Sequence, residues 1–305
     1  MDARKQISRV GWCFVAFILV YMAASWFLSL VIFFAFFRFD MRWYDNNLSM
    51  LLADLLMYGV AFPVFFLLMR RLPSWRKEKK EAVSVSGFVR LFFISLGTTY
   101  LGNLIGLGLM AAVGESVGQD ILNPVTETFG NMEPWAMFVT TVLIAPVMEE
   151  LMFRKMLIDR LVPFGQKMAV LLSGLCFGLF HGNFYQFFYA TALGFIFAYV
   201  YSSTGRLREP VLLHMCINFV GGVLPTIVEN GIRAGNLSAW WADAGLTGIL
   251  LFSIAVAVME FVKRIRLLSW FPAWERSEKG MVFTVLTAPG VWGFLIASVM
   301  LFFMN

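Results

Sequence analysis

The chain contains only two histidines, His181 and His214, and both lie within strongly apolar stretches. A third apolar stretch carries the adjacent carboxylates Glu149 and Glu150, followed by Arg154. Ionisable side chains are costly within a membrane, so they usually face the interior of a helix bundle and mark a functional site or pathway. The three clusters hold every histidine of the chain. We therefore expect them to form one buried catalytic centre.

The spacing within each cluster places its members on one face of a helix, because residues i and i+4 lie one above the other. The pairs with this spacing are Glu150 and Arg154, Phe177 and His181, and His214 and Asn218. We expect Arg154 to neutralise Glu150. Glu149 points about 100° away from Glu150 around the helix, so it is free to face a different space.

Helix-breaking and small residues accompany the clusters. Pro146 should leave the carbonyl of Val142 without its usual donor, which loosens the helix one turn before Glu149. Gly174 and Gly178 precede the first histidine, and small residues at this spacing let membrane helices approach closely. The sequence thus predicts that this histidine is brought against a neighbouring helix.

The composition indicates the environment in which these clusters lie. Apolar residues make up 60% of the chain and aromatic residues 17%, with a mean hydropathy of +0.76, which exceeds the usual values for a soluble domain. A membrane helix needs about 20 apolar residues to cross about 30 Å of hydrocarbon. The sequence predicts an all-α, polytopic transmembrane bundle of eight to nine spans around a buried polar catalytic cavity. The expected spans lie near 10–37, 48–69, 86–113, 135–160, 167–183, 185–202, 210–228, 243–262 and 282–304.

The first apolar run is too long for the core of a signal peptide, so we expect it to be retained as a span. The segment 70–80 holds six Lys or Arg residues, whereas the loop 114–134 holds four acidic residues and neither Lys nor Arg. Cationic loops stay in the cytoplasm, which predicts a cytoplasmic N-terminus. The net charge of +5 then reflects topology and contact with anionic membrane lipid rather than nucleic-acid binding.

The motifs divide the chain into three parts. Residues 1–129 form N-terminal transmembrane helices, about three spans, with the basic cytoplasmic loop. Residues 130–228 form the catalytic core, and residues 229–305 form C-terminal transmembrane helices. Asp54 and Asn103 also lie within spans. Because they have no partner motif, we expect them to be polar groups that bridge helices rather than site residues.

The three motifs in this order resemble the CPBP family of intramembrane endopeptidases, also called the Abi or CAAX-processing family. The matching elements are Glu-Glu-x-x-x-Arg at 149–154, Phe-x-x-x-His at 177–181 and His-x-x-x-Asn at 214–218. The order of the three motifs, the spacing within each motif and their placement within spans all agree with the pattern of this family. The resemblance implies proteolysis within the membrane. It also implies that Glu149 and His181 activate a water molecule, and that His214 and Asn218 hold the oxyanion. We expect no cofactor, with zinc as the alternative.

The chemistry of these residue types supports the implied roles. Hydrolysis of a peptide bond needs a base for water and donors for the charge that develops on the carbonyl oxygen. Glu149 in a low-dielectric site would be an effective base, and His181 could share the proton of the water and supply it to the leaving amine. An imidazole N–H of His214 and an amide N–H of Asn218 would form an oxyanion hole, which is worth on the order of 3 kcal/mol per donor.

Each assignment has a simpler alternative. Glu150 and Arg154 could be an ion pair that only stabilises the helix, and His181 could be a structural histidine that bonds across helices. Phe177 is expected to pack and shape the cavity. The supporting residues of the predicted site are therefore Glu150, Arg154 and Phe177.

Three other functions fit parts of the pattern. A zinc metalloprotease could use Glu149, His181 and His214 as ligands with one open position. We rank it second, because no helix carries two histidines in an HExxH-type pair and Asn218 suits an oxyanion better than a metal. A bacteriocin-immunity or scaffold protein could keep the fold without catalysis, although it would not need intact motifs. A transporter would be expected to show paired broken helices in two halves, which the sequence lacks. The expected partners are membrane lipid and a membrane-associated protein or peptide substrate.

Overall fold

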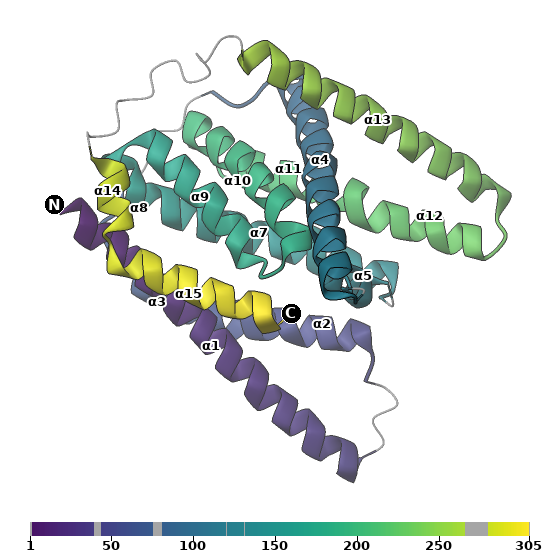
Figure 1. Cartoon of the computed structure of the whole chain (residues 1–305), viewed down its shortest axis with the longest axis horizontal. Helices are drawn as coiled ribbons and strands as arrows, with labels where there is room; N and C mark the ends of the chain where they lie inside the picture. The colour runs from purple at the N-terminus through teal and green to yellow at the C-terminus, as the bar shows by residue number, and fades with distance from the viewer. Residues whose placement is uncertain are drawn as a thin grey trace.

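The computed structural model describes residues 2–39, 44–75, 81–119, 121–130, 132–265 and 280–304. Every regular element within these residues is a helix, and the helices form a bundle with the first and last helices side by side (Figure 1). The predicted all-α transmembrane bundle is confirmed. The predicted cytoplasmic charges at 76–80 and the loop 266–279 lie outside the described residues.

Seven helical segments of the described chain are long and apolar enough to cross a membrane, slightly fewer than the predicted eight to nine. They are Ala3–Arg38, Asn46–Met69, Val85–Val117, Pro134–Phe164, Phe184–Thr204, Arg208–Arg233 and Leu237–Lys263. The two other predicted spans correspond to the shorter apolar helices Gln166–Phe180 and Pro289–Phe303. Their length explains the difference, because a helix of 15 residues rises only about 22 Å.

Four spans are continuous helices, and three are interrupted. The continuous ones are α1 (Ala3–Arg38), α4 (Val85–Val117), α10 (Phe184–Thr204) and α13 (Leu237–Ile265). The first interrupted span consists of α2 (Asn46–Asp54), η1 (Leu55–Ala61) and α3 (Phe62–Met69). The second consists of α6 (Pro134–Met137), η2 (Phe138–Ile144), α7 (Ala145–Glu150), η3 (Leu151–Ile158), α8 (Asp159–Leu161) and the 3₁₀ turn η4 (Val162–Phe164). The third consists of α11 (Arg208–Asn218), η5 (Phe219–Val223) and α12 (Leu224–Arg233).

Three of the interruptions precede a proline. The π-helical turns η1, η2 and η5 end just before Pro63, Pro146 and Pro225, respectively. Proline has no N–H to donate to the preceding turn, so the helix widens there instead of closing its regular bonds. The predicted loosening before Glu149 is confirmed as the π-helical turn η2. Such turns occur frequently at functional sites.

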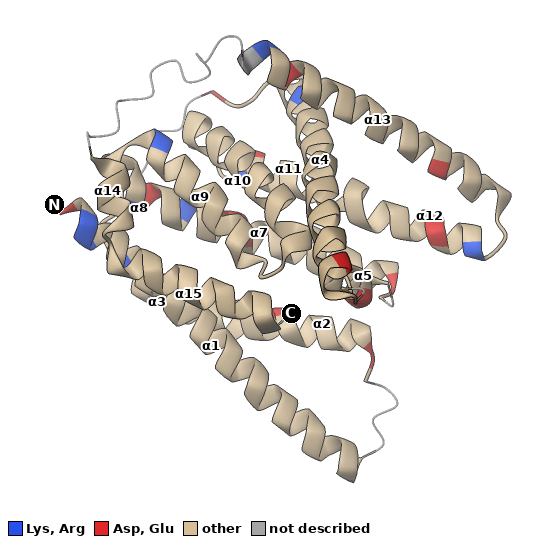
Figure 2. Cartoon of the chain, viewed as in Figure 1, with Lys and Arg blue, Asp and Glu red and all other residues tan. Residues whose placement is uncertain are grey.

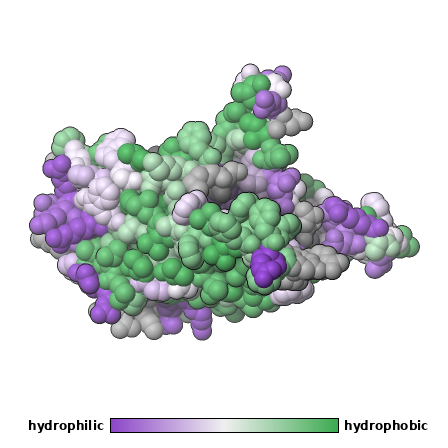
Figure 3. All heavy atoms as spheres, turned by 90° about the horizontal axis from the view of Figure 1, so that it is seen from below, coloured by the Kyte–Doolittle hydropathy of each residue, from purple (hydrophilic) through white to green (hydrophobic). Residues whose placement is uncertain are grey.

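The shorter helices complete the bundle. They are α5 (Pro124–Phe129), α9 (Gln166–Phe180), α14 (Met281–Leu286) and α15 (Pro289–Met304). Helix α10 packs between α9 and α4, α4 packs in turn on α13, and α1 packs on α15. In Figure 3 a broad apolar surface lies between polar ends, as expected of a protein whose middle contacts lipid.

Charge is distributed unevenly along the bundle. Figure 2 shows Lys and Arg at the start of α1 and toward the end of α13, whereas acidic residues gather at the end of α4 and on α5. This asymmetry agrees with the charge bias on which the predicted cytoplasmic N-terminus was based. The chain is an integral membrane protein, and its orientation stays a prediction.

The crossing of α9 and α10 is tight because glycine faces glycine. A Cβ atom added to Gly194 would lie 2.7 Å from the Cα atom of Gly174, and one added to Gly178 would lie 2.8 Å from the carbonyl oxygen of Phe187. The close approach predicted from the small residues of α9 is therefore confirmed. It fixes the end of α9, where His181 follows, against α10.

We expect Gly194→Ala to lower the unfolding free energy by about 1–3 kcal/mol, because the added methyl group can be accommodated only if two helix backbones move apart. Thermal unfolding of the purified protein in detergent measures the effect. Gly108→Ala on α4 is the control, since its Cβ would meet no atom within 4 Å. Equal midpoints for the two variants would contradict the proposed tight crossing.

Candidate active site

The predicted clusters come together from three helical segments. Glu149 and Glu150 end α7, His181 directly follows α9, and His214 lies in the middle of α11. The ring of Phe177 joins them, because its centroid lies 5.0 Å from that of His181 and 5.7 Å from that of His214. The sequence prediction that these groups share one buried region thus agrees with the arrangement of the described residues.

Arg154 and Glu150 form an ion pair in the interior of the bundle. The Nε atom of Arg154 lies 2.8 Å from Oε2 of Glu150, and both side chains are 0% exposed. The guanidinium also donates to Oγ of Ser173 at 3.1 Å, and its central carbon lies 4.7 Å above the ring of Phe177. The i,i+4 spacing predicted this pairing. The additional contacts tie the pair to α9.

His214 lies between the two glutamates. Its Nδ1 atom lies 3.1 Å from Oε1 of Glu150, and its Nε2 atom lies 3.9 Å from Oε2 of Glu149. Glu150 carries the negative charge opposite Arg154, so Nδ1 of His214 is assigned as the N–H donor of this hydrogen bond. Nε2 can then donate only if the imidazole is protonated.

Asn218 is held by the interrupted helix. Its Nδ2 atom donates to the carbonyl oxygen of Thr141 at 2.7 Å. In the π-helical turn the N–H of Ala145 bonds the carbonyl of Thr140, so the next carbonyl, that of Thr141, would need the N–H that Pro146 lacks. Asn218 satisfies this carbonyl with one of its two amide hydrogens. The second amide hydrogen is left for another acceptor.

The expectation for Val142 needs a correction. The sequence analysis assumed α-helical bonding, in which Pro146 would deprive the carbonyl of Val142 of its donor. Because the turn is π-helical, the missing bond moves back by one residue, to Thr141. The missing backbone bond also positions a site residue, because the freed carbonyl of Thr141 accepts a hydrogen bond from the side chain of Asn218.

His181 has a defined orientation. Its Nδ1 atom lies 2.8 Å from the carbonyl oxygen of Phe177, which makes Nδ1 the N–H donor and leaves Nε2 with a lone pair in the neutral ring. The side chain is half-buried. An imidazole in this state can accept a proton from a neighbouring water and release it again.

Two residues outside the predicted motifs also lie at the site. The hydroxyl of Tyr58 donates to Oε1 of Glu149 at 3.4 Å. Asp54, one helical turn before Tyr58, is 7% exposed, and its charge interacts with that of Glu149. The sequence analysis treated Asp54 as a helix-bridging group. Its i,i+4 spacing from Tyr58, the spacing that defines the other clusters, is the signal that could have identified the pair.

The described residues do not provide a ready metal site. No group of three His, Cys, Asp or Glu side chains among them is arranged to hold an ion. In the zinc alternative, Glu149, His181 and His214 would be the ligands, and the two histidines would bind through Nε2, because both Nδ1 atoms bond protein oxygens. Metal dependence stays a prediction.

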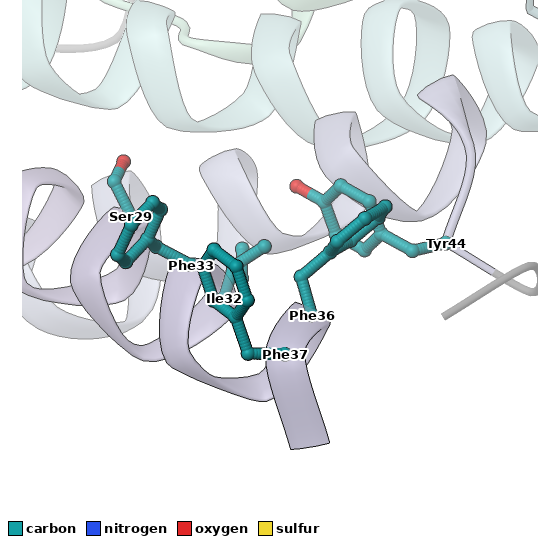
Figure 4. A pocket seen from close by; sticks show the side chains of 6 residues that line it. All are labelled: Ser29, Ile32, Phe33, Phe36, Phe37 and Tyr44. Atoms are coloured by element: carbon teal, nitrogen blue, oxygen red, sulfur yellow. The ribbon is translucent and has the colours of Figure 1, made fainter. Parts of the chain in front are cut away.

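Two surface grooves lie apart from this site. One, of about 380 Å³, is lined by aromatic and aliphatic side chains of α1 and by Tyr44 (Figure 4). The other, of about 390 Å³, is lined by Asn46, Ser49, Met50, Ala53, Glu127 and Thr128. Neither groove includes a residue of the three motifs. The motif residues therefore lie in the buried cluster and outside both grooves.

Breaking the buried ion pair between Arg154 and Glu150 should lower the stability of the fold strongly. Arg154→Ala should lower the unfolding free energy by about 3–5 kcal/mol, because it leaves Glu150 as an unpaired charge in the interior. Arg233→Ala is the matched control, since Arg233 pairs with Glu229 at the same i,i+4 spacing but both side chains are more than half exposed. That change should cost under about 0.5 kcal/mol. Similar losses in thermal unfolding would contradict a structural role for the buried pair.

The amino-acid sequence of the chain is similar to those of known proteins, over a region that contains the site. Residues 131–220 match the family model described as type II CAAX prenyl endopeptidase Rce1-like. The curated protein named "Putative membrane peptidase YdiL", from Bacillus subtilis (strain 168), is 26% identical over 160 residues, which cover 51% of this chain and 64% of that protein. The protein named "CAAX prenyl protease 2", from Arabidopsis thaliana, is 27% identical over 270 residues, which cover 81% of this chain and 74% of that protein. No solved structure matches the chain.

The matched residues contain all three motifs and lie inside the predicted core of 130–228. The chain spans about two thirds of the Bacillus relative and about three quarters of the Arabidopsis relative. The division of the chain into three parts stays a prediction. The resemblance predicted from the motifs is confirmed: residues 131–220 match the Rce1-like CAAX prenyl endopeptidase model, and the two curated relatives are named as a membrane peptidase and a CAAX prenyl protease.

Proposed function

We propose that the chain is an intramembrane endopeptidase that hydrolyses a peptide bond of a membrane-associated protein or peptide. One observation carries the proposal. In the interior of an apolar bundle, Glu149 lies 3.9 Å from the imidazole of His214, which Glu150 fixes, and the ring of Phe177 lies between His214 and a second imidazole, that of His181, which a backbone carbonyl fixes. A base and two oriented proton carriers at one point are the requirements of water-dependent amide hydrolysis.

The first step is activation of water. Glu149 accepts a proton from a water molecule, and the lone pair on Nε2 of His181 provides a second acceptor for the same proton. The surrounding apolar bundle keeps bulk water away, which strengthens the interaction of a carboxylate with the one water it activates. The hydroxide that forms adds to the scissile carbonyl carbon.

The second step needs donors for the negative charge on the carbonyl oxygen. His214 can supply its Nε2–H when the ring is protonated, and Glu150 fixes the orientation of the ring through Nδ1. Asn218 can supply the amide hydrogen that Thr141 does not use. Both side chains are fixed before the substrate arrives, so their reorganisation costs little as the charge develops.

Collapse of the tetrahedral intermediate breaks the C–N bond. The leaving nitrogen takes the proton that Glu149 and His181 removed from water, so it departs as an amine. The carbonyl carbon keeps the oxygen of water and becomes a carboxylic acid. The two groups return to their starting state without any further reactant.

The substrate class follows from the location of the site and from the relatives. A buried site within the bundle suits a chain that reaches it from the membrane. The name of the Arabidopsis relative speaks of a CAAX prenyl protease. A peptide with a prenylated CAAX terminus is therefore the first probe of activity.

Two other functions remain as alternatives. In the zinc protease, Nε2 of His214 would bind the ion and could not serve the oxyanion together with Asn218, and no group of three His, Cys, Asp or Glu side chains among the described residues is arranged to hold an ion. The non-catalytic immunity or scaffold protein would give no reason for the fixed orientations of His181, His214 and Asn218. We therefore rank both below the metal-independent protease.

The first test compares variants reconstituted in lipid vesicles. Wild-type protein should cleave a quenched fluorogenic peptide with a prenylated CAAX terminus. Glu149→Gln and His181→Ala should each abolish cleavage and leave thermal stability near the wild-type value, because both groups serve the water rather than the fold. Asn103→Ala, a change to a polar residue of a span outside the motifs, should keep its activity. Turnover by Glu149→Gln at the wild-type rate would contradict the proposed mechanism.

A second test addresses the metal alternative. If Glu149 acts on a water that no ion holds, activity should survive prolonged phenanthroline treatment, and active protein should contain far less than one zinc ion per chain. Elemental analysis and the peptide assay measure both on the same sample. Zinc bound at one ion per chain, lost together with activity and restored with it, would favour the metalloprotease instead.

A further inference from the structure

The segment formed by α2 and η1 lies outside the residues that match the family model, yet it reaches the site. Tyr58, in the middle of η1, directs its hydroxyl at Oε1 of Glu149 from 3.4 Å. Asp54, at the end of α2, lies one turn earlier on the same helix face and is almost fully buried. The segment of α2 and η1 therefore adds the side chains of Asp54 and Tyr58 to the site that the three motifs form.

The hydrogen bond has a defined direction. Of the two groups, the phenol carries an O–H that can donate, whereas the oxygens of a carboxylate accept. Tyr58 therefore donates the hydrogen bond and Oε1 of Glu149 accepts it. Within the described residues, Oδ2 of Asp54 has no hydrogen-bond partner, so Glu149 is the acceptor that the structure offers to the Tyr58 hydroxyl.

This donation separates the tasks of the two oxygens of Glu149. Oε1 accepts from Tyr58, whereas Oε2 lies toward Nε2 of His214, at 3.9 Å. A glutamate side chain has several rotatable bonds, so a free carboxylate would sample orientations that do not serve the water. Contacts at both oxygens restrict it to one. Such restriction before the substrate arrives is a major source of rate enhancement.

We propose that Tyr58 is a positioning residue for Glu149: its hydroxyl holds Oε1, so that Oε2 is directed at the water and at His214. The proposal rests on the proposed protease function and adds a residue from the N-terminal part of the chain to its site. The widened turn η1, which Pro63 ends, aims Tyr58 at the site.

The experiment compares Tyr58→Phe with wild type in vesicles, using the prenylated CAAX peptide. Phenylalanine keeps the ring and its packing and removes only the donor. We expect kcat to fall about tenfold with KM unchanged, because a hydrogen bond to a charged group is lost while substrate contacts remain. Tyr185→Phe is the matched control, since the hydroxyl of Tyr185 donates to the carbonyl of Ile121 at 2.6 Å, away from Glu149. Its kcat per folded molecule should equal that of wild type.

A second variant separates positioning from a purely structural role. In a Glu149→Asp background the carboxylate is too short to reach the hydroxyl, so Tyr58→Phe should cause no further loss of kcat. Three outcomes would overturn the positioning role. One is a full tenfold loss of kcat from Tyr58→Phe in the Glu149→Asp background. The others are a Tyr58→Phe single variant with unchanged kcat, with or without a raised KM. A wild-type protein that cleaves neither the peptide nor any protein of the host membrane would instead overturn the proposed function.

Discussion

The ion pair between Glu150 and Arg154 is the interaction on which the centre of the bundle depends. Both side chains are 0% exposed, and a charge buried in this way is tolerated only if it is paired and hydrogen-bonded. The pair meets that condition through contacts to several elements. Arg154 bonds Ser173 on α9 and lies over the ring of Phe177, and Glu150 bonds His214 on α11. The requirement to satisfy two buried charges thus brings three helices into register.

The same requirement orients the proposed catalytic groups. Because Glu150 is occupied by Arg154 and by Nδ1 of His214, the other nitrogen of His214 is directed toward Glu149. Two adjacent glutamates therefore have different tasks. Glu150 balances charge and fixes a ring, whereas Glu149 remains available for water. A hydrophobic replacement of the ion pair could preserve the fold, but it would lose the orientation of His214.

The interrupted helices supply the second part of the geometry. Pro146 removes the donor that the carbonyl of Thr141 would use in the π-helical turn, and Asn218 fills that position. The hydrogen bond missing from η2 is therefore replaced by one from Asn218 on α11, and this bond holds that side chain in place. A similar turn in η1 ends just before Pro63 and carries Tyr58. In this protein the prolines do more than end helices, because the backbone irregularities next to them hold and aim polar side chains.

The sequence predicted much of this arrangement, and what it missed has a physical reason. Apolar runs and i,i+4 spacing identified the bundle and the pairing of Glu150 with Arg154, because both depend on local periodicity. The carbonyl freed by Pro146 was misplaced by one residue, since α-helical and π-helical bonding cannot be distinguished from the residue types. Tyr58 was missed because its contact with Glu149 joins residues far apart in the chain. The i,i+4 spacing of Asp54 and Tyr58 was the local signal available, but it did not show that the pair faces Glu149.

If Glu149 serves a hydrolytic site, the protein cuts other proteins in the membrane. A proteomic comparison of C-termini tests this in membranes from cells that carry either wild-type protein or Glu149→Gln at equal levels. New C-termini should occur only with wild type, and they would define the substrates. Identical C-termini in the two membranes, with both proteins folded and present, would contradict a hydrolytic role of Glu149.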